Sequence, residues 1–121
     1  MTEKTFTCDN EGMMGAQAFL ESVCEAPKPG IVMDEIVSNI VRCSGAKAFT
    51  VGLDQTGEGL AMVFSDNGVA FDPTQDAEAP NLSSSLDDRS VGGLGIFMVK
   101  KMAKSVEYRR ENDRNVLKVV M

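Results

Sequence analysis

Two pairs of short runs with alternating apolar residues constrain the fold more than any other feature of this sequence. The first pair is separated by residues 54–58, which include a glycine suited to a turn, and predicts a β-hairpin. Residues 106–111 and 116–120 form a second pair around Asn112-Asp113-Arg114. A chain with two such hairpins builds a largely antiparallel sheet. The alternating apolar residues of the first pair are Phe49, Val51 and Leu53, followed by Leu60, Met62 and Phe64.

Three other segments repeat their apolar residues with helical spacing. Asp9 or Asn10 can cap the first of these helices, and residues 27–30, Pro-Lys-Pro-Gly, are expected to separate it from the second. These elements predict an α+β fold, a two-layer sandwich with three helices on one face of a mostly antiparallel sheet. The expected helices span about residues 11–26, 31–43 and 93–104, and a short strand precedes them at residues 4–8.

Composition limits the possible functions. With 121 residues and 43% hydrophobic content, we expect one domain, residues 1–121, with one core. No apolar run approaches the roughly 20 residues of a membrane span and the start resembles no signal peptide, so we expect a cytoplasmic protein without membrane contact. Because there is no histidine, acid–base catalysis must use a carboxylate. The three cysteines have no zinc-site spacing, and we interpret them as buried thiols.

Charge is unevenly distributed along the chain. The net charge of −6 argues against a nucleic-acid partner. Residues 86–121, however, carry 8 basic and 5 acidic side chains, whereas residues 1–85 carry 4 and 13. The basic end would suit an anionic ligand or an acidic partner, or it is a solvated helix face. Residues 66–91 show no periodicity, and a connection of this length predicts a lid or a disordered segment.

The second predicted helix carries the first candidate site. At about 100° per residue, Glu35, Asn39 and Arg42 share the side opposite its apolar stripe. The amide oxygen of Asn39 can ligate Mg²⁺, and Glu35, one turn earlier, can orient or deprotonate a hydroxyl group. The alternative is an ordinary solvated helix face.

A second candidate site follows the predicted strand that ends in Asp66-Asn67-Gly68. The Asp66 carboxylate can accept a hydrogen bond from an exocyclic amine such as N6 of adenine. Gly68 would let the ligand approach the backbone. A plain Asn-Gly turn is the alternative, although the apolar residues Val69 to Phe71 suggest a loop folded inward.

The third candidate site is Gly92-Gly93-Leu94-Gly95, which runs into a predicted helix. Free backbone amides and the positive end of a helix dipole favour phosphate binding there. The spacing matches neither a dinucleotide-binding fingerprint nor a P-loop, and a flexible hinge is the alternative. Arg89, Lys100 and Lys101 could add positive charge.

In these residues the chain resembles the GHKL ATPase superfamily, and most closely its bacterial anti-sigma-factor serine kinases. Glu35-x-x-x-Asn39 matches the N box of that family, residues 66–73 its first glycine box and residues 89–96 its second. The closing hairpin is also similar, and the resemblance covers about residues 29–121. Two departures are Ala70, where a glycine is usual, and Cys43, where many relatives have histidine.

The resemblance implies a Bergerat-type sandwich that binds ATP and Mg²⁺ under a lid at residues 74–91. Glu35 would be the catalytic base and Asn39 the metal ligand, with Asp66 reading adenine. The implied reaction is phosphorylation of a serine on a STAS-type anti-anti-sigma protein, coupled to sequestration of a sigma factor by a homodimer. The implied nucleotide-binding residues are Asn39, Arg42, Asp66, Gly68, Ala70, Phe71, Arg89, Gly92, Gly93, Leu94, Gly95 and Ile96.

Two other interpretations remain open. The first is a nucleotide-gated interaction module of the same fold that transfers no phosphate, which Ala70 would favour if its methyl group crowded the nucleotide. The second is a detached ATPase domain of a sensor histidine kinase, which would need a phosphoacceptor histidine on another chain.

Overall fold

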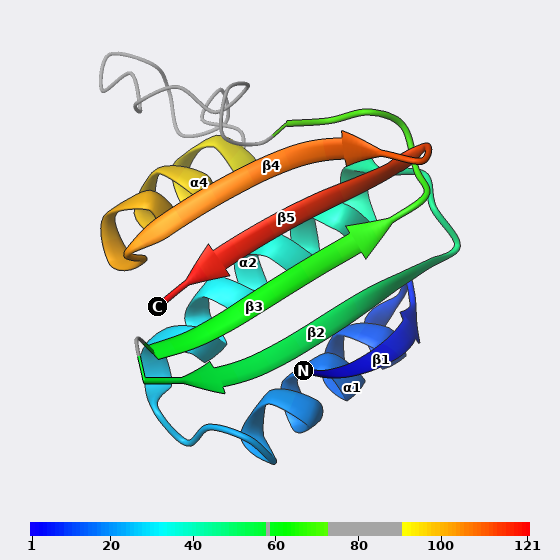
Figure 1. The fold of residues 1–121 in the computed structure, drawn as a ribbon. Helices are drawn as coiled ribbons and strands as arrows, with labels where there is room; N and C mark the ends of the chain where they lie inside the picture. Colours follow the sequence, from blue (N-terminus) through cyan, green and yellow to red (C-terminus); the bar gives the residue numbers. More distant parts are fainter. Residues whose placement is uncertain (58, 73–90) are drawn as a thin grey trace.

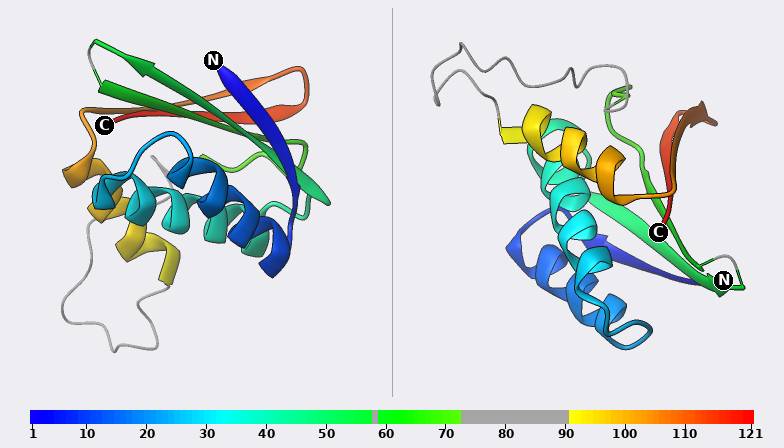
Figure 2. Two further views of the ribbon diagram at one scale, coloured as in Figure 1. Left: turned by 90° about the horizontal axis from the view of Figure 1, so that it is seen from below. Right: turned by 90° about the vertical axis from the view of Figure 1, so that its left-hand side faces the viewer.

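The computed structural model describes residues 1–57, 59–72 and 91–121, with only the backbone for residues 91–96. Five strands form one antiparallel sheet in the order β1-β2-β3-β5-β4. Three helices in the described ranges cover one face of this sheet, as both views in Figure 2 show. The predicted α+β sandwich is therefore confirmed. The strands are β1 (Thr2–Thr7), β2 (Ala48–Thr56), β3 (Gly59–Asp66), β4 (Ser105–Glu111) and β5 (Arg114–Val120), and the helices are α1 (Asn10–Glu21), α2 (Pro27–Cys43) and α4 (Val91–Met102) (Figure 1).

Both predicted hairpins are present. The strands β2 and β3 pair as far as Thr56 and Gly59, so the turn is tighter than the five residues predicted. In the β4–β5 hairpin, Asn112 and Asp113 have φ angles of 53° and 61°. A two-residue turn with positive φ at both central positions matches the twist of the flanking strands, and Asn and Asp adopt this conformation more readily than other non-glycine residues.

Helix α1 begins as the sequence predicts but ends earlier. Asp9 is its N-cap, and the Oδ1 atom of Asp9 accepts a hydrogen bond of 2.8 Å from the backbone N–H of Gly12. The helix ends at Glu21 rather than near Ala26. Its last turn is closed by the Ser22 hydroxyl, which donates to the carbonyl of Phe19 at 2.6 Å.

The prediction that residues 27–30 separate the first two helices is wrong, because these residues form the first turn of α2. Pro27 occupies the start of α2, where a missing N–H costs nothing and the fixed φ of proline already suits a helix. Helix α2 is thus about one turn longer than predicted. It ends at Cys43, followed by Gly45 with φ of +70°.

The core lies between the sheet and the helices. The buried strand residues alternate, so that one face of β2, β3 and β5 meets the helices. This inward alternation includes two polar residues, Asp66 at the end of β3 and Asn115 in β5, which are 3% and 7% exposed. The apolar residues buried in this layer are Phe49, Val51, Leu53, Leu60, Met62, Phe64, Leu117 and Val119 from the sheet, and Val32, Met33, Ile36 and Val37 from α2.

Two further expectations concern cysteines and membranes. Cys8 and Cys24 are half-buried, but Cys43 at the end of α2 is exposed, so the prediction of three buried thiols is wrong. Among the described helices, none is long and apolar enough to cross a membrane.

Candidate nucleotide-binding site

Helix α2 forms one wall of the site and brings the three predicted residues together. Asn39 is 5% exposed, and its Oδ1 atom accepts a hydrogen bond of 2.8 Å from Nη2 of Arg42. The Nδ2 group of Asn39 is buried and has no hydrogen-bond partner within the described residues. A buried N–H group without a partner is costly, which makes this amide a candidate donor to a ligand.

Glu35 lies one turn before Asn39 and is half-buried. In the described part of the chain, its Oε1 atom is buried and unpartnered. Burial raises the pKa of Glu35, Arg42 lowers it in part, and the neighbouring Asp34 raises it further. The carboxylate is therefore a stronger base than an ordinary glutamate. It lines an open groove of about 360 Å³ between α2 and α4, together with Pro27, Gly30, Ile31, Asp34, Met98, Val99 and Met102.

Asp66 ends β3 on the opposite wall. Its Oδ1 atom accepts hydrogen bonds from the backbone N–H of Gly68 at 2.8 Å and from Nδ2 of Asn115 at 3.1 Å. Its Oδ2 atom accepts no hydrogen bond from any residue that the structure describes. One carboxylate oxygen is therefore fixed by the protein, and the other remains available as an acceptor.

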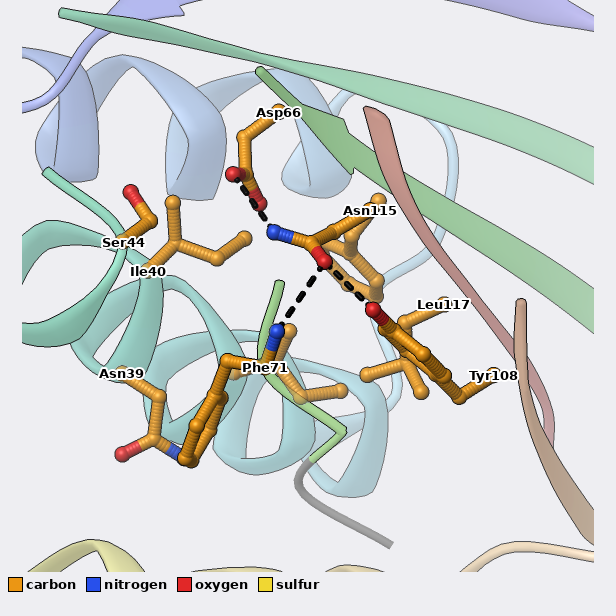
Figure 3. A pocket seen from close by; sticks show the side chains of 10 residues that line it. Asn39, Ile40, Ser44, Asp66, Phe71, Tyr108, Asn115 and Leu117 are labelled. Carbon is orange, nitrogen blue, oxygen red and sulfur yellow. Dashed lines mark hydrogen bonds between the residues drawn. The ribbon is translucent and has the colours of Figure 1, made fainter. Parts of the chain in front are cut away.

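A mainly apolar pocket joins Asp66 to Asn39 (Figure 3). It encloses about 30 Å³, which is roughly the space of one water molecule, so a purine base requires a lining residue to move. Phe71 comes from the loop after β3, and it can move without disturbing a helix or strand. The lining residues are Ile36, Asn39, Ile40, Ser44, Phe64, Asp66, Phe71, Tyr108, Asn115 and Leu117.

The structure explains the need for glycine at position 68 differently from the sequence prediction, which was close approach of a ligand. A Cβ atom at this position would lie 2.1 Å from the carbonyl oxygen of Ser44, at the end of α2. The next residue, Val69, donates its backbone N–H to the same oxygen at 2.8 Å. Gly68 is thus required for close packing of the loop against α2, before any ligand is considered. Ala70 is exposed and does not line the pocket.

The glycine-rich segment lies wholly inside α4, which begins two residues before the predicted start at about residue 93. Helix α4 begins at Val91, so Gly92, Gly93, Leu94, Gly95 and Ile96 occupy its first two turns. The first four N–H groups of a helix have no partner within the helix, so those of Val91 to Leu94 could face a phosphate, whereas the N–H groups of Gly95 and Ile96 lie in the hydrogen-bonded part of α4.

The two helices run antiparallel across the site. The N-terminal half of α2 lines the open groove with the C-terminal half of α4, and Figure 2 shows the two helices side by side. The N-terminus of α4 therefore lies toward the Asn39 end of α2. Arg89 and all of the predicted lid except Val91 fall outside the described residues.

Sequence reasoning missed Asn115 and Tyr108, both of which line the pocket. Asn115 is the Cα partner of Asp66 across β3 and β5. A signal existed, because Asn115 occupies an inward position of an alternating strand whose other inward residues, Leu117 and Val119, are apolar. A polar residue at such a position needs a buried partner.

Comparison with known proteins agrees with this geometry. Residues 17–121 match the family described as the histidine kinase-like ATPase domain. The chain belongs to this family. It is also 37% identical over 92 residues to the serine/threonine-protein kinase BtrW of Bordetella bronchiseptica, a match that covers 69% of this chain and 61% of BtrW. Membership assigns the chain to a class of ATP-binding domains, and the similarity to BtrW supports a kinase-like function.

The residues present fit ATP with Mg²⁺ better than a metal held by protein alone. No group of three or more Cys, Asp or Glu side chains in the described ranges could hold a metal ion. Mg²⁺ commonly takes only one or two protein ligands and completes its shell with substrate phosphates and water. Within Asn39 only the Oδ1 atom, which accepts from Arg42, could be such a ligand, and the unpartnered Nδ2 group could donate to a phosphate oxygen.

Proposed function

We propose that this protein is an ATP-dependent serine kinase that phosphorylates a STAS-type anti-anti-sigma protein and sequesters a sigma factor. One observation carries the proposal: within the described residues, Glu35 and Asn39 bury unpartnered polar atoms one turn apart on α2, and the neighbouring helix α4 begins with a glycine-rich turn. The resemblance to anti-sigma-factor kinases adds the identity of the partners. It also favours a homodimer that acts in the cytoplasm.

In the proposed reaction Glu35 takes the proton of the acceptor serine, whose oxygen attacks the terminal phosphorus of ATP while the bond to ADP breaks. The raised pKa of Glu35 suits a general base, because proton transfer is most effective when the pKa of the base lies near the working pH. Asn39 would hold Mg²⁺, which neutralises phosphate charge when bound. Arg42 would exchange its bond to Asn39 for a phosphate oxygen.

The groove between α2 and α4 offers the acceptor serine a route to Glu35. Ile31 and Met98, on facing helices, are 52% and 49% exposed, although both are large and apolar. Asp34 adds a second carboxylate to the same groove. We therefore propose that a serine-bearing segment with apolar and basic neighbours docks here, while the base of ATP enters from the side of Asp66.

The decisive test combines binding and transfer. The wild-type protein is mixed with γ-labelled ATP, Mg²⁺ and a STAS-domain protein from the same genome, and label on the STAS protein is measured. Titration calorimetry follows ATP binding separately. Wild-type protein should bind ATP and transfer label, whereas Glu35→Gln should bind ATP with an affinity within about threefold of wild type and lose at least about 100-fold in transfer rate.

Glu11→Gln is the matched control, since it makes the same change at an exposed glutamate of α1 that does not line the groove. It should keep transfer within about tenfold of wild type. A Glu35→Gln protein that transfers phosphate at the wild-type rate would remove the assigned base. ATP binding without any transfer by the wild type would instead support the nucleotide-gated interaction module.

A further inference from the structure

Asn115 makes four hydrogen bonds in the wall of the pocket, and Figure 3 draws those with Asp66, Phe71 and Tyr108. Its Nδ2 group donates to Oδ1 of Asp66 at 3.1 Å and to the carbonyl of Val69 at 2.8 Å. Its Oδ1 atom accepts from the backbone N–H of Phe71 at 3.2 Å and from the hydroxyl of Tyr108 at 2.5 Å. An amide side chain has two donors and two acceptor sites, so Asn115 is fully used by the protein.

Three of these partners set the orientation of the Asn115 amide: the Phe71 N–H can only donate, and the Asp66 carboxylate and the Val69 carbonyl can only accept. If the amide rotated by half a turn, its NH₂ group would face the Tyr108 hydroxyl and the Phe71 N–H, and its oxygen would face the Asp66 carboxylate. The contacts with Phe71 and Asp66 would then each set like dipoles against one another, whereas the Tyr108 hydroxyl could turn and accept a hydrogen bond. Tyr108 acts on Asp66 through Asn115 by anchoring the amide, because its hydrogen bond to Oδ1 is made in the orientation that points the NH₂ group toward the carboxylate.

The same contacts determine which oxygen of Asp66 a ligand can use. Asn115 and the Gly68 N–H both bind Oδ1, so Oδ2 is the acceptor that remains in the described structure. A carboxylate held from one side cannot rotate freely about its Cβ–Cγ bond. Its free oxygen accepts a hydrogen bond from an amine and repels the carbonyl oxygen of a 6-oxopurine.

We propose that Asn115, fixed by Tyr108, is a positioning residue that sets the selectivity of this pocket for an aminopurine over an oxopurine. Asn115 itself has no free group with which to contact the base. It acts by presenting Oδ2 of Asp66 toward the exocyclic amine. The inference rests on the proposed binding of ATP and adds the residues that decide its base selectivity.

The test measures dissociation constants for ATP, GTP and purine riboside triphosphate, which lacks the exocyclic amine. Tyr108→Phe is the main variant, because it removes only the hydroxyl group and preserves the ring; Asn115→Ala is the second. Ser65→Ala is the matched control: Ser65 precedes Asp66 and bonds Arg114 on β5 at 2.9 Å, outside the Asn115 network.

Wild-type protein should prefer ATP to both other nucleotides. In Tyr108→Phe the preference for ATP over the analogue without the amine should fall about 5-fold, and in Asn115→Ala about 10-fold or more, as expected for loss of one or two buried hydrogen bonds. Ser65→Ala should keep the wild-type ratio within about twofold. The ratio of dissociation constants is the right measurement, because a general loss of folded protein would weaken the binding of all three nucleotides equally.

Three outcomes would overturn the proposal. Tyr108→Phe and Asn115→Ala could both bind ATP with the wild-type selectivity, which would leave Asn115 with a purely structural role. Ser65→Ala could lose selectivity to the same degree, which would show that any change in this strand pair has the effect. A wild-type protein that binds no nucleotide would overturn both the inference and the proposed function, whereas ATP binding without phosphate transfer would overturn only the kinase.

Discussion

Substitution of Gly68 by alanine tests the closest backbone approach in the site. The added Cβ atom would lie 2.1 Å from the carbonyl oxygen of Ser44, and the loop must move by about 1 Å to relieve this contact because neither backbone can yield as a side chain would. That movement would break the 2.8 Å hydrogen bond from the N–H of Val69 to the same oxygen. It would also pull the Gly68 N–H away from Oδ1 of Asp66.

The cost can be estimated from these contacts. Overpacking in a tightly packed region costs about 1–3 kcal/mol, and one lost hydrogen bond adds about 1 kcal/mol. Gly68→Ala should therefore lower the free energy of unfolding by about 2–4 kcal/mol, measured by urea denaturation at pH 7. ATP affinity of the folded fraction should fall as well, because Asp66 loses one of its two fixed partners.

Gly57→Ala is the matched control, since a Cβ atom at Gly57 would meet nothing within 4 Å. It should change the free energy of unfolding by no more than about 0.5 kcal/mol. If Gly68→Ala is as stable as Gly57→Ala, the loop does not pack on Ser44 as described. The argument from close approach would then be refuted.

The remaining predictions concern helices α2 and α4. Because burial raises the pKa of Glu35, this carboxyl group binds its proton more tightly in the folded protein than in the unfolded chain. The free energy of unfolding should therefore fall as pH rises from the ordinary glutamate pKa through the raised one. Glu35→Gln should remove this contribution to the pH dependence, measured by urea denaturation at several pH values. Asn39→Ala should change the free energy of unfolding by less than about 1 kcal/mol, because removal of the buried, unpartnered Nδ2 group offsets the lost hydrogen bond to Arg42. Mg²⁺-dependent ATP binding should nevertheless weaken at least about 10-fold. An equal loss of ATP affinity with and without Mg²⁺ would argue against Asn39 as a metal ligand. Met98→Asp, in the groove between α2 and α4, should raise the KM for the STAS protein at least about 10-fold with little change in ATP affinity. The control Met14→Asp changes a methionine that is 73% exposed on α1 outside this groove, and it should leave both quantities unchanged. An unaltered KM for Met98→Asp would exclude the groove as the docking site.

Local patterns in the sequence were sufficient for most of the fold. Alternating residues predicted both hairpins and helical spacing predicted α1, α2 and α4, because each pattern reflects which side of an element meets the core. The differences lie at the ends of elements, as at the early end of α1 and above all at the start of α2. The sequence analysis interpreted Pro27 and Pro29 as helix breakers, although proline in the first turn is compatible with a helix. The local pattern did not distinguish a proline that ends one helix from a proline that begins the next.

The candidate site also has a part that the sequence predicted and a part that it did not. The sequence alone placed Glu35, Asn39 and Arg42 on one side of a helix and Asp66 at the end of a strand, since spacing along one element determines which residues share a face. Only the tertiary structure decided which elements meet across the site. The register that pairs Asp66 with Asn115 and the packing of Gly68 on Ser44 depend on contacts between segments about 25 to 50 residues apart. Tyr108 meets Asn115 through the pairing of β4 with β5, and periodicity within one segment carries no information about the segments that it contacts.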